Sequence, residues 1–315
     1  MESANISLGQ KTDRRNPRLD SFKFTLKLFI KNKTAFVGLI IVVIYAILTI
    51  LDFVYPQYLG ASNINTILSF TNGVGGPQPP ITGFGWWRLL GTTGYNRIAI
   101  FPAMLAALKV DIPISFEVVI FGAIIGAIIG TASGFLGGYL DEVVMRVTDV
   151  FFSVPFLIMA IAFVIVFRTS LPGLDPFILA LIITWWPIYA RVTRGLALTI
   201  KSQKFVEAAV AAGASRARNI FVHVLPNVLS PIFVQISLDL GTIVQIFATL
   251  FFLGFAAASP DTPELGNLMV QGINYFPTGD WWPLVVPGVF LVIFTIAVNL
   301  VGDGLRDVLD PRVRR

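Results

Sequence analysis

The apolar positions of the chain gather in long uncharged runs that short charged stretches separate. The first run covers residues 34–51, and a helix of that length, at about 1.5 Å per residue, nearly crosses a hydrocarbon core of about 30 Å. A helix on the surface of a soluble protein would instead have one apolar face and one polar face. The pattern predicts an all-α integral membrane protein. Six transmembrane helices are expected, at residues 34–51, 118–140, 150–167, 176–190, from 229 onward, and 281–302.

Prolines mark where several of these helices are expected to begin. Pro155 falls in the first turns of the third span, where a missing N–H costs least. Residues 219–260 would form a helix of about 60 Å, roughly twice the thickness of the hydrocarbon core. Pro226 and Pro231 are expected to break this stretch, so that the fifth span begins near Leu229.

Glycines recur every fourth residue in the second span, at Gly122, Gly126, Gly130 and Gly134. This spacing places them on one face of a helix. Small residues on such a face let a neighbouring helix approach closely, which favours packing inside lipid. We therefore expect helix packing along this stripe, with a functional hinge as the alternative.

The amino-acid composition limits the classes of function that the chain can have. The chain is 55% hydrophobic and 13% charged, outside the usual balance of a soluble domain. Its net charge of +5 comes from residues that flank the apolar runs, so a nucleic-acid site is not expected. With no Cys and one His, disulfides, thiolate chemistry and multi-histidine metal sites are excluded.

Positive charges orient the expected helices, because Lys and Arg gather on the cytoplasmic side of a membrane. With the N-terminus in the cytoplasm, all but four of the 23 Lys and Arg residues fall on that side. The prediction is a multi-pass protein of the cell membrane with both termini cytoplasmic. Its expected parts are a cytoplasmic tail at 1–33, a first transmembrane helix at 34–55, an extracytoplasmic segment at 56–110, a five-helix core at 111–303 that includes the loop 201–227, and a cytoplasmic tail at 304–315.

The loop 201–227 differs in design from the spans. Its first half is Ala-rich and favours a helix, and Gly213 permits a turn with positive φ. Ser215 can cap a second short helix that runs toward Val224 until Pro226 stops it. Two helices this short are marginal alone in water, so we expect a partner surface. An amphipathic connector lying on the membrane is the alternative.

This loop also resembles the EAA loop of ABC importer permeases. Glu207, Ala208 and Ala209 precede Gly213, and nine residues later the stretch 223–227 reads HVLPN, which is similar to the dipeptide/oligopeptide/nickel branch of that family. The end of the chain resembles the second, C-type permease of such importers. The residues that carry this C-terminal motif are Gly302, Asp303, Gly304, Leu305, Arg306, Asp307, Asp310 and Pro311.

The resemblance implies a type I ABC importer-like fold in which the loop is a coupling helix seated on an ATPase subunit. Glu207 would anchor this helix by charge, Ala208 and Ala209 would allow close approach, and Gly213 would supply the turn. His223 is either a packed or capped side chain, or a pH switch or ligand. The residues assigned to the coupling interface are Glu207, Ala208, Ala209, Gly213, Ser215, His223, Leu225, Pro226 and Asn227.

The same resemblance implies the partners. These are a second homologous permease that forms a heterodimer, two ABC ATPase subunits, an extracellular substrate-binding protein and membrane lipid. The sequence has no GxxxxGK[ST] phosphate loop, no GxSxG elbow and no HExxH pair, so we expect a non-catalytic subunit with no bound cofactor or metal. ATP and Mg would be held by the partner ATPases.

Two polar residues of the fifth span are candidates for the translocation path. Asp239 is ionisable at membrane depth and Gln245 lies six residues further on. A polar pair that holds the partner permease is the structural alternative, and an ion-coupled secondary transporter or channel that uses Asp239 is the functional one. The EAA-type loop favours the ABC permease, because a secondary carrier needs no docking helix.

The cargo remains open between peptides, oligosaccharides and nickel. The family's outer motif, GTDxxGRDxxSR, is represented by residues 91–97, which lack its acids. A Glu common in the fifth span is replaced by Phe247. We expect both changes to face the translocation side, which would allow an oligosaccharide cargo.

Overall fold

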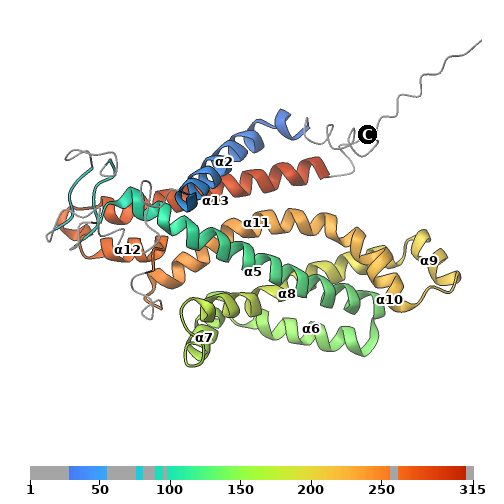
Figure 1. The fold of residues 1–315 in the computed structure, drawn as a ribbon. Helices are drawn as coiled ribbons and strands as arrows, with labels where there is room; N and C mark the ends of the chain where they lie inside the picture. Colours follow the sequence, from blue (N-terminus) through green and yellow to red (C-terminus); the bar gives the residue numbers. More distant parts are fainter. Residues whose placement is uncertain (1–27, 55–75, 81–88, 95–97, 256–261, 310–315) are drawn as a thin grey trace, which may run out of the picture.

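The computed structural model describes residues 28–54, 76–80, 89–94, 98–255 and 262–309. Across these ranges the regular secondary structure is helical, and turns or irregular segments connect the helices; an isolated antiparallel bridge joins Thr92 to Ala99. The long helices run beside one another, with α9 at one end of the bundle and α12 at the other (Figure 1). The helices are α2 Lys33–Val54, α5 Ile100–Leu136, α6 Gly138–Ser153, α7 Phe156–Phe167, α8 Asp175–Lys201, α9 Lys204–Ala211, α10 Arg216–Arg218, a π-helix Asn219–Val224, α11 Leu225–Phe252, α12 Leu265–Ile273, a 3₁₀-helix Phe276–Thr278 and α13 Trp282–Leu309.

Five of the described helical stretches are long and apolar enough to cross a membrane: α2, α5, α8, the path Arg216–Phe252, and α13. Helices α6 and α7 make a sixth if they are counted as one span, but they are bent by 96°. The expectation of one helix over 150–167 is therefore wrong. Val154 is extended, as a residue before proline prefers to be, and Pro155 sits outside α7 as its N-cap.

Helix α5 begins much earlier than the hydropathy pattern predicts. It starts at Ile100 instead of residue 118, and Gly137, with a φ of 67°, follows its end at Leu136. Residues 100–110 of the expected extracytoplasmic segment 56–110 are thus helical. Charged residues hid this part of the helix, although two of them are paired or buried: Lys109 Nζ lies 2.7 Å from Asp52 Oδ2, and Asp111 is fully buried.

The expected stop at Pro226 and the start near Leu229 are also wrong. The helical path continues from Arg216 to Phe252 with Pro226 and Pro231 inside it. A wider π-turn precedes Pro226, where Leu225 N–H donates to Ile220 O, and the proline falls in the first turn of α11, where its missing N–H costs least. At the other end of the chain, α13 runs on to Leu309, so residues 304–309 of the expected tail are helical.

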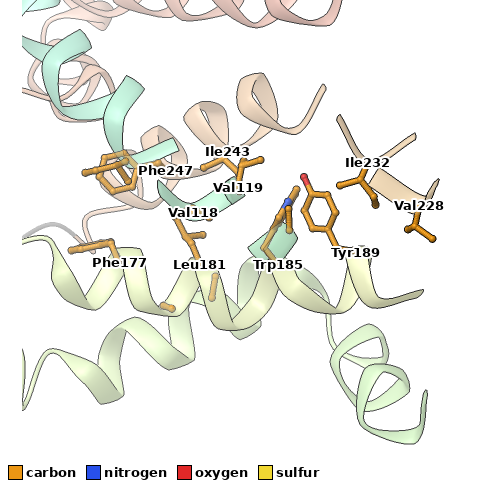
Figure 2. Close-up of a cluster of buried hydrophobic side chains, with 14 of the residues drawn as sticks. Val118, Val119, Phe177, Leu181, Trp185, Tyr189, Val228, Ile232, Ile243 and Phe247 are labelled. Carbon is orange, nitrogen blue, oxygen red and sulfur yellow. The ribbon is translucent and has the colours of Figure 1, made fainter. Parts of the chain in front are cut away.

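The glycine stripe of α5 packs directly on α8, which confirms the packing prediction. A Cβ at Gly126 would lie 2.5 Å from Trp186 O, and one at Gly134 would lie 2.7 Å from Arg194 O. Thr193 Oγ1 donates to Gly126 O at 3.1 Å across this contact. Facing side chains of α5, α8 and α11 form the main core, and Figure 2 shows Val118, Leu181 and Ile243 among them.

Two ion pairs fasten α6 to α8. Arg194 donates to both carboxylate oxygens of Asp141, with Nε 2.6 Å from Oδ1 and Nη2 2.7 Å from Oδ2. Arg191 Nη2 lies 2.6 Å from Asp149 Oδ1. The bidentate pair is partly buried, so it fixes the position of α6 more firmly than an exposed pair would.

Candidate functional site

The segment from α9 to the start of α11 protrudes at one end of the bundle (Figure 1). Only Ser202 and Gln203 separate α8 from α9, and α10 continues through the π-helix into α11. The segment is therefore joined to a long helix at each of its two ends. Two residues join α9 to α8, while the turn, α10 and the π-helix join α9 to α11.

The turn inside this segment forms as the sequence predicts. Gly213 has a φ of 83°, a conformation that favours glycine, and Ala214 N–H donates to Ala209 O at 3.0 Å. Ser215 is the N-cap of α10, and its Oγ accepts from Arg218 N at 3.3 Å. The two arms of the segment are thus held at a defined angle.

Buried anchors that sequence reasoning missed hold the segment in place. Val206, Ile220 and Val224 are 1%, 6% and 0% exposed and belong to the main core. Asn219 is also buried, and its Nδ2 donates to Ala214 O at 3.1 Å. The available signal was the four-residue spacing of Ile220 and Val224, which places both on one helix face.

The predicted interface residues lie on or near the free surface of this segment. Glu207, Ala208, Gly213, Ser215, Pro226 and Asn227 are exposed, and Ala209, His223 and Leu225 are half-buried. Asn227 Nδ2 donates to His223 O at 2.7 Å. Large apolar side chains are exposed beside them: Phe205, Val210, Phe221 and Val222.

An apolar surface with one carboxylate and several cations around it suits a protein partner with a matching hollow. Glu207 is the acidic residue of α9, while Lys204, Arg216 and Arg218 supply exposed positive charge. Apolar side chains contribute most of the affinity in such contacts, and charges at the rim set the orientation and the rate of association.

Asp239 is buried between α8 and α11 and is 5% exposed. Its Oδ2 accepts from Trp185 Nε1 at 3.1 Å, and its Oδ1 accepts from Gln235 Nε2 at 2.7 Å. Figure 2 shows Trp185 projecting from α8. The carboxylate therefore links the two helices that continue into the α9 segment.

Asp239 and Gln245 are not brought together. Asp239 is buried and Gln245 is exposed, because six residues turn a helix by about 600° and leave the two on different faces. Phe247 was expected to face the translocation side, which is wrong, since it is fully buried between Phe177 and Phe251. The position therefore belongs to an aromatic part of the core.

The C-terminal motif packs α13 against its neighbours. A Cβ at Gly302 would lie 2.6 Å from Leu238 of α11, and one at Gly304 would overlap Ala35 of α2. Asp307 accepts from Asn32 Nδ2 at 3.1 Å. Leu305 is half-buried, and Asp303 and Arg306 are exposed. Asp310 and Pro311 lie outside the described residues.

With this geometry in place, comparison with known proteins gives a direct result. A family model for the "Binding-protein-dependent transport system inner membrane component" matches residues 122–315. The chain belongs to this family. The matched range includes the α9 segment and the C-terminal motif, so the two stretches that carried the sequence resemblance lie within it.

Curated members of the family match over most of the chain. Dipeptide transport system permease protein DppC of Escherichia coli (strain K12) is 37% identical over 287 residues, covering 91% of this chain and 92% of that protein. Oligopeptide transport system permease protein OppC of Bacillus subtilis (strain 168) is 33% identical over 316 residues, covering 99% and 96%. The predicted membership among ABC importer permeases of the dipeptide and oligopeptide type is confirmed.

A solved structure supports the fold. One chain of the MetNI methionine ABC transporter, in inward-facing conformations, matches with a TM-score of 0.53 and 23% identity, covering 65% of this chain and 96% of that chain. The predicted type I importer-like, all-helical fold is confirmed. Across the described residues, no group of three or more His, Cys, Asp or Glu side chains is arranged to hold a metal ion.

Proposed function

We propose that this chain forms half of the translocation path of an ATP-driven peptide importer and docks on a separate ATPase subunit through α9, Gly213 and α10. The observation that carries the proposal is the design of this segment: exposed at its tip, anchored at its base by Val206 and Val224, and joined directly to α8 and α11. A rigid projection of this kind can transmit movement, whereas a loose loop would absorb it.

The remaining parts of the importer follow from family membership. A second homologous permease completes the path as a heterodimer, two ATPase subunits bind ATP and Mg, and an extracellular binding protein delivers the cargo. This chain is a non-catalytic subunit in that assembly. Its α9 end and both termini face the cytoplasm, where the positively charged residues gather. The α12 end faces outward.

Peptides are the proposed cargo, because the curated relatives are named for dipeptide and oligopeptide transport. Oligosaccharides stay the second candidate, on the strength of the outer stretch 91–97, which lacks acids. Thermal-shift screening of the cognate binding protein with peptides, sugars and Ni²⁺ decides between the candidates. Stabilisation by sugars or Ni²⁺ alone would rule out the peptide assignment.

The docking role can be tested by reversing one charge. In Glu207→Arg, the exposed carboxylate of α9 becomes a cation, and we expect the ATPases to be lost on co-purification. Glu142→Arg is the matched control, because Glu142 is also exposed and lies on α6. If Glu207→Arg keeps its ATPases and transports normally, the docking assignment is wrong.

The turn provides a second test. Gly213→Val forces a β-branched residue into a φ of 83°, which costs about 1–3 kcal/mol and displaces α9. Gly195→Val is the control, because a Cβ at Gly195 meets no atom within 4 Å and its φ is not positive. Retention of the ATPases by Gly213→Val at control levels would argue against a fixed turn as the coupling element.

Family membership favours this function over an ion-coupled carrier that uses Asp239. A carrier would move ions without any ATPase. Proteoliposomes that contain the purified chain alone therefore give a direct comparison. We expect no ion-driven uptake from them, and uptake that disappears in Asp239→Asn would support the carrier instead.

A further inference from the structure

Two carboxyl groups meet at the α12 end of the bundle, away from the α9 segment. Asp111 of α5 and Glu264, the N-cap of α12, are both fully buried. Asp111 Oδ2 accepts from Leu265 N at 3.3 Å, and Leu265 is the residue next to Glu264. Glu264 Oε2 accepts from Asn267 N at 2.8 Å. The backbone at the start of α12 therefore joins the two side chains.

Each carboxyl group also has one oxygen that accepts nothing. Asp111 Oδ1 and Glu264 Oε1 are buried, and neither has a hydrogen-bond partner among the described residues. A buried polar atom without a partner costs about 1–3 kcal/mol. Two buried carboxylates side by side also repel each other, and such pairs are relieved when one of them holds a proton.

Among the residues that the structure describes, the charged groups near this pair do not neutralise it. On α5, Lys109 is two residues from Asp111, but its Nζ pairs with Asp52 of α2 at 2.7 Å. Arg168, at the end of α7, donates to Phe255 O just beyond α11. Helix α12 carries no charged residue, and the charged residues of α13 lie in its last turns, at Asp303 and beyond.

We propose that Asp111 and Glu264 form a proton-binding site, in which one proton is shared between Asp111 Oδ1 and Glu264 Oε1 and holds the start of α12 against α5. The proton supplies the donor that both free oxygens lack. When it leaves, two adjacent anions remain in a buried place. The start of α12 then separates from α5, so the site makes this end of the bundle sensitive to alkaline pH.

The packing of α12 makes such a release selective. A Cβ at Gly266 would overlap Ala248 of α11, and one at Gly272 would lie 2.5 Å from Leu284 N of α13. Backbone contacts thus hold α12 on α11 and α13, while its attachment to α5 includes the bond to Asp111. Loss of the proton is expected to loosen the first turn of α12 and to leave its far end in place.

The direction of the pH effect follows from Glu264, because burial raises its pKa above the ordinary value for a glutamate. Between the ordinary and the raised pKa the folded chain holds a proton that the unfolded chain has released. Stability therefore falls as pH rises through this window and is fully present only below it.

Hydrogen exchange of the peptide 265–273, measured on the purified full-length chain and corrected for intrinsic rates, tests the proposal. We expect protection at about pH 6 and faster exchange at about pH 8.5. Glu264→Gln and Asp111→Asn supply an N–H donor that does not titrate, so both should remove the pH dependence. Glu117→Gln, an exposed change on α5, should behave as the wild type does.

Infrared difference spectra provide a readout that does not depend on these variants refolding equally well. The wild type should show the C=O band of a protonated carboxyl group at about pH 6 that fades as pH rises toward about 8.5. Three results would each overturn the proposal. The first is exchange of the wild-type peptide 265–273 that does not depend on pH, and the second is a pH dependence that persists in both amide variants. The third is the absence of a titrating carboxyl band. None of these results depends on the docking role of α9.

Discussion

Adding one methyl group to α5 at Gly126 should push two helices apart. In Gly126→Ala the new Cβ would lie 2.5 Å from both Trp186 O and Tyr189 Cβ of α8, where ordinary contact begins near 3.4 Å. The helices must separate by roughly 0.9 Å, and overpacking of this kind costs about 1–3 kcal/mol. The bond from Thr193 to Gly126 O also weakens, which costs about 0.6 kcal/mol. Replacing a glycine by alanine inside a helix stabilises the protein by up to about 1 kcal/mol, which offsets part of this loss.

The net expectation for Gly126→Ala is a loss of about 1–3 kcal/mol in the free energy of unfolding. Gly122→Ala is the matched control, because its Cβ would meet Trp185 Cβ at 3.5 Å, an ordinary contact. We expect that variant to be neutral or up to about 1 kcal/mol more stable. Unfolding the purified protein in mixed detergent micelles with increasing SDS measures both. If the two variants agree within about 0.5 kcal/mol, the glycine stripe does not set the distance between α5 and α8.

Substitutions at three further positions have defined outcomes. Ser215→Ala removes the cap of α10 and should raise local amide exchange there, equivalent to about 1 kcal/mol, with unchanged exchange elsewhere. Arg194→Lys replaces the two guanidinium bonds to Asp141 with a single ammonium bond, while Ser133 Oγ still donates to the carboxylate. It should lower thermal stability by about 1 kcal/mol, and an unchanged melting temperature would contradict this. Asp239→Leu should lower the free energy of unfolding by about 1–3 kcal/mol, because it leaves the Trp185 N–H without an acceptor. Asp239→Asn should lower it less, because the amide oxygen can still accept. Equal losses of the two variants in SDS unfolding would show that this bond does not stabilise the contact between α8 and α11.

Hydropathy predicts the spans well where the chain is uniformly apolar. Residues 34–51 lie within α2, and the fourth run lies within α8, because lipid-exposed and buried positions are both apolar in a membrane bundle. Local chemistry also predicts the turn at Gly213 and the cap at Ser215, since both depend on neighbours in sequence. These features need no knowledge of the tertiary fold.

The missed features all depend on contacts between distant residues. The first turns of α5 contain Lys109, which reads as a loop until Asp52 is placed beside it. The bond from Trp185 to Asp239 joins two helices, and the sequence around Asp239 does not indicate this partner. The carboxyl pair at α12 joins residues 153 positions apart, from Asp111 to Glu264, and no sequence spacing indicates it.

The helical path from Arg216 to Phe252 would act as a lever arm if the α9 segment moved. It contains 37 residues, so at about 1.5 Å per residue it is about 55 Å long. Asp239 lies roughly two thirds of the way along it and ties it to α8, so this carboxylate would be the fulcrum. A rotation of about 5° about such a point moves each tip by roughly 2–3 Å in opposite directions. A small displacement of the α9 segment is then delivered, with its sign reversed, to the far end of the same helix, where α12 is packed.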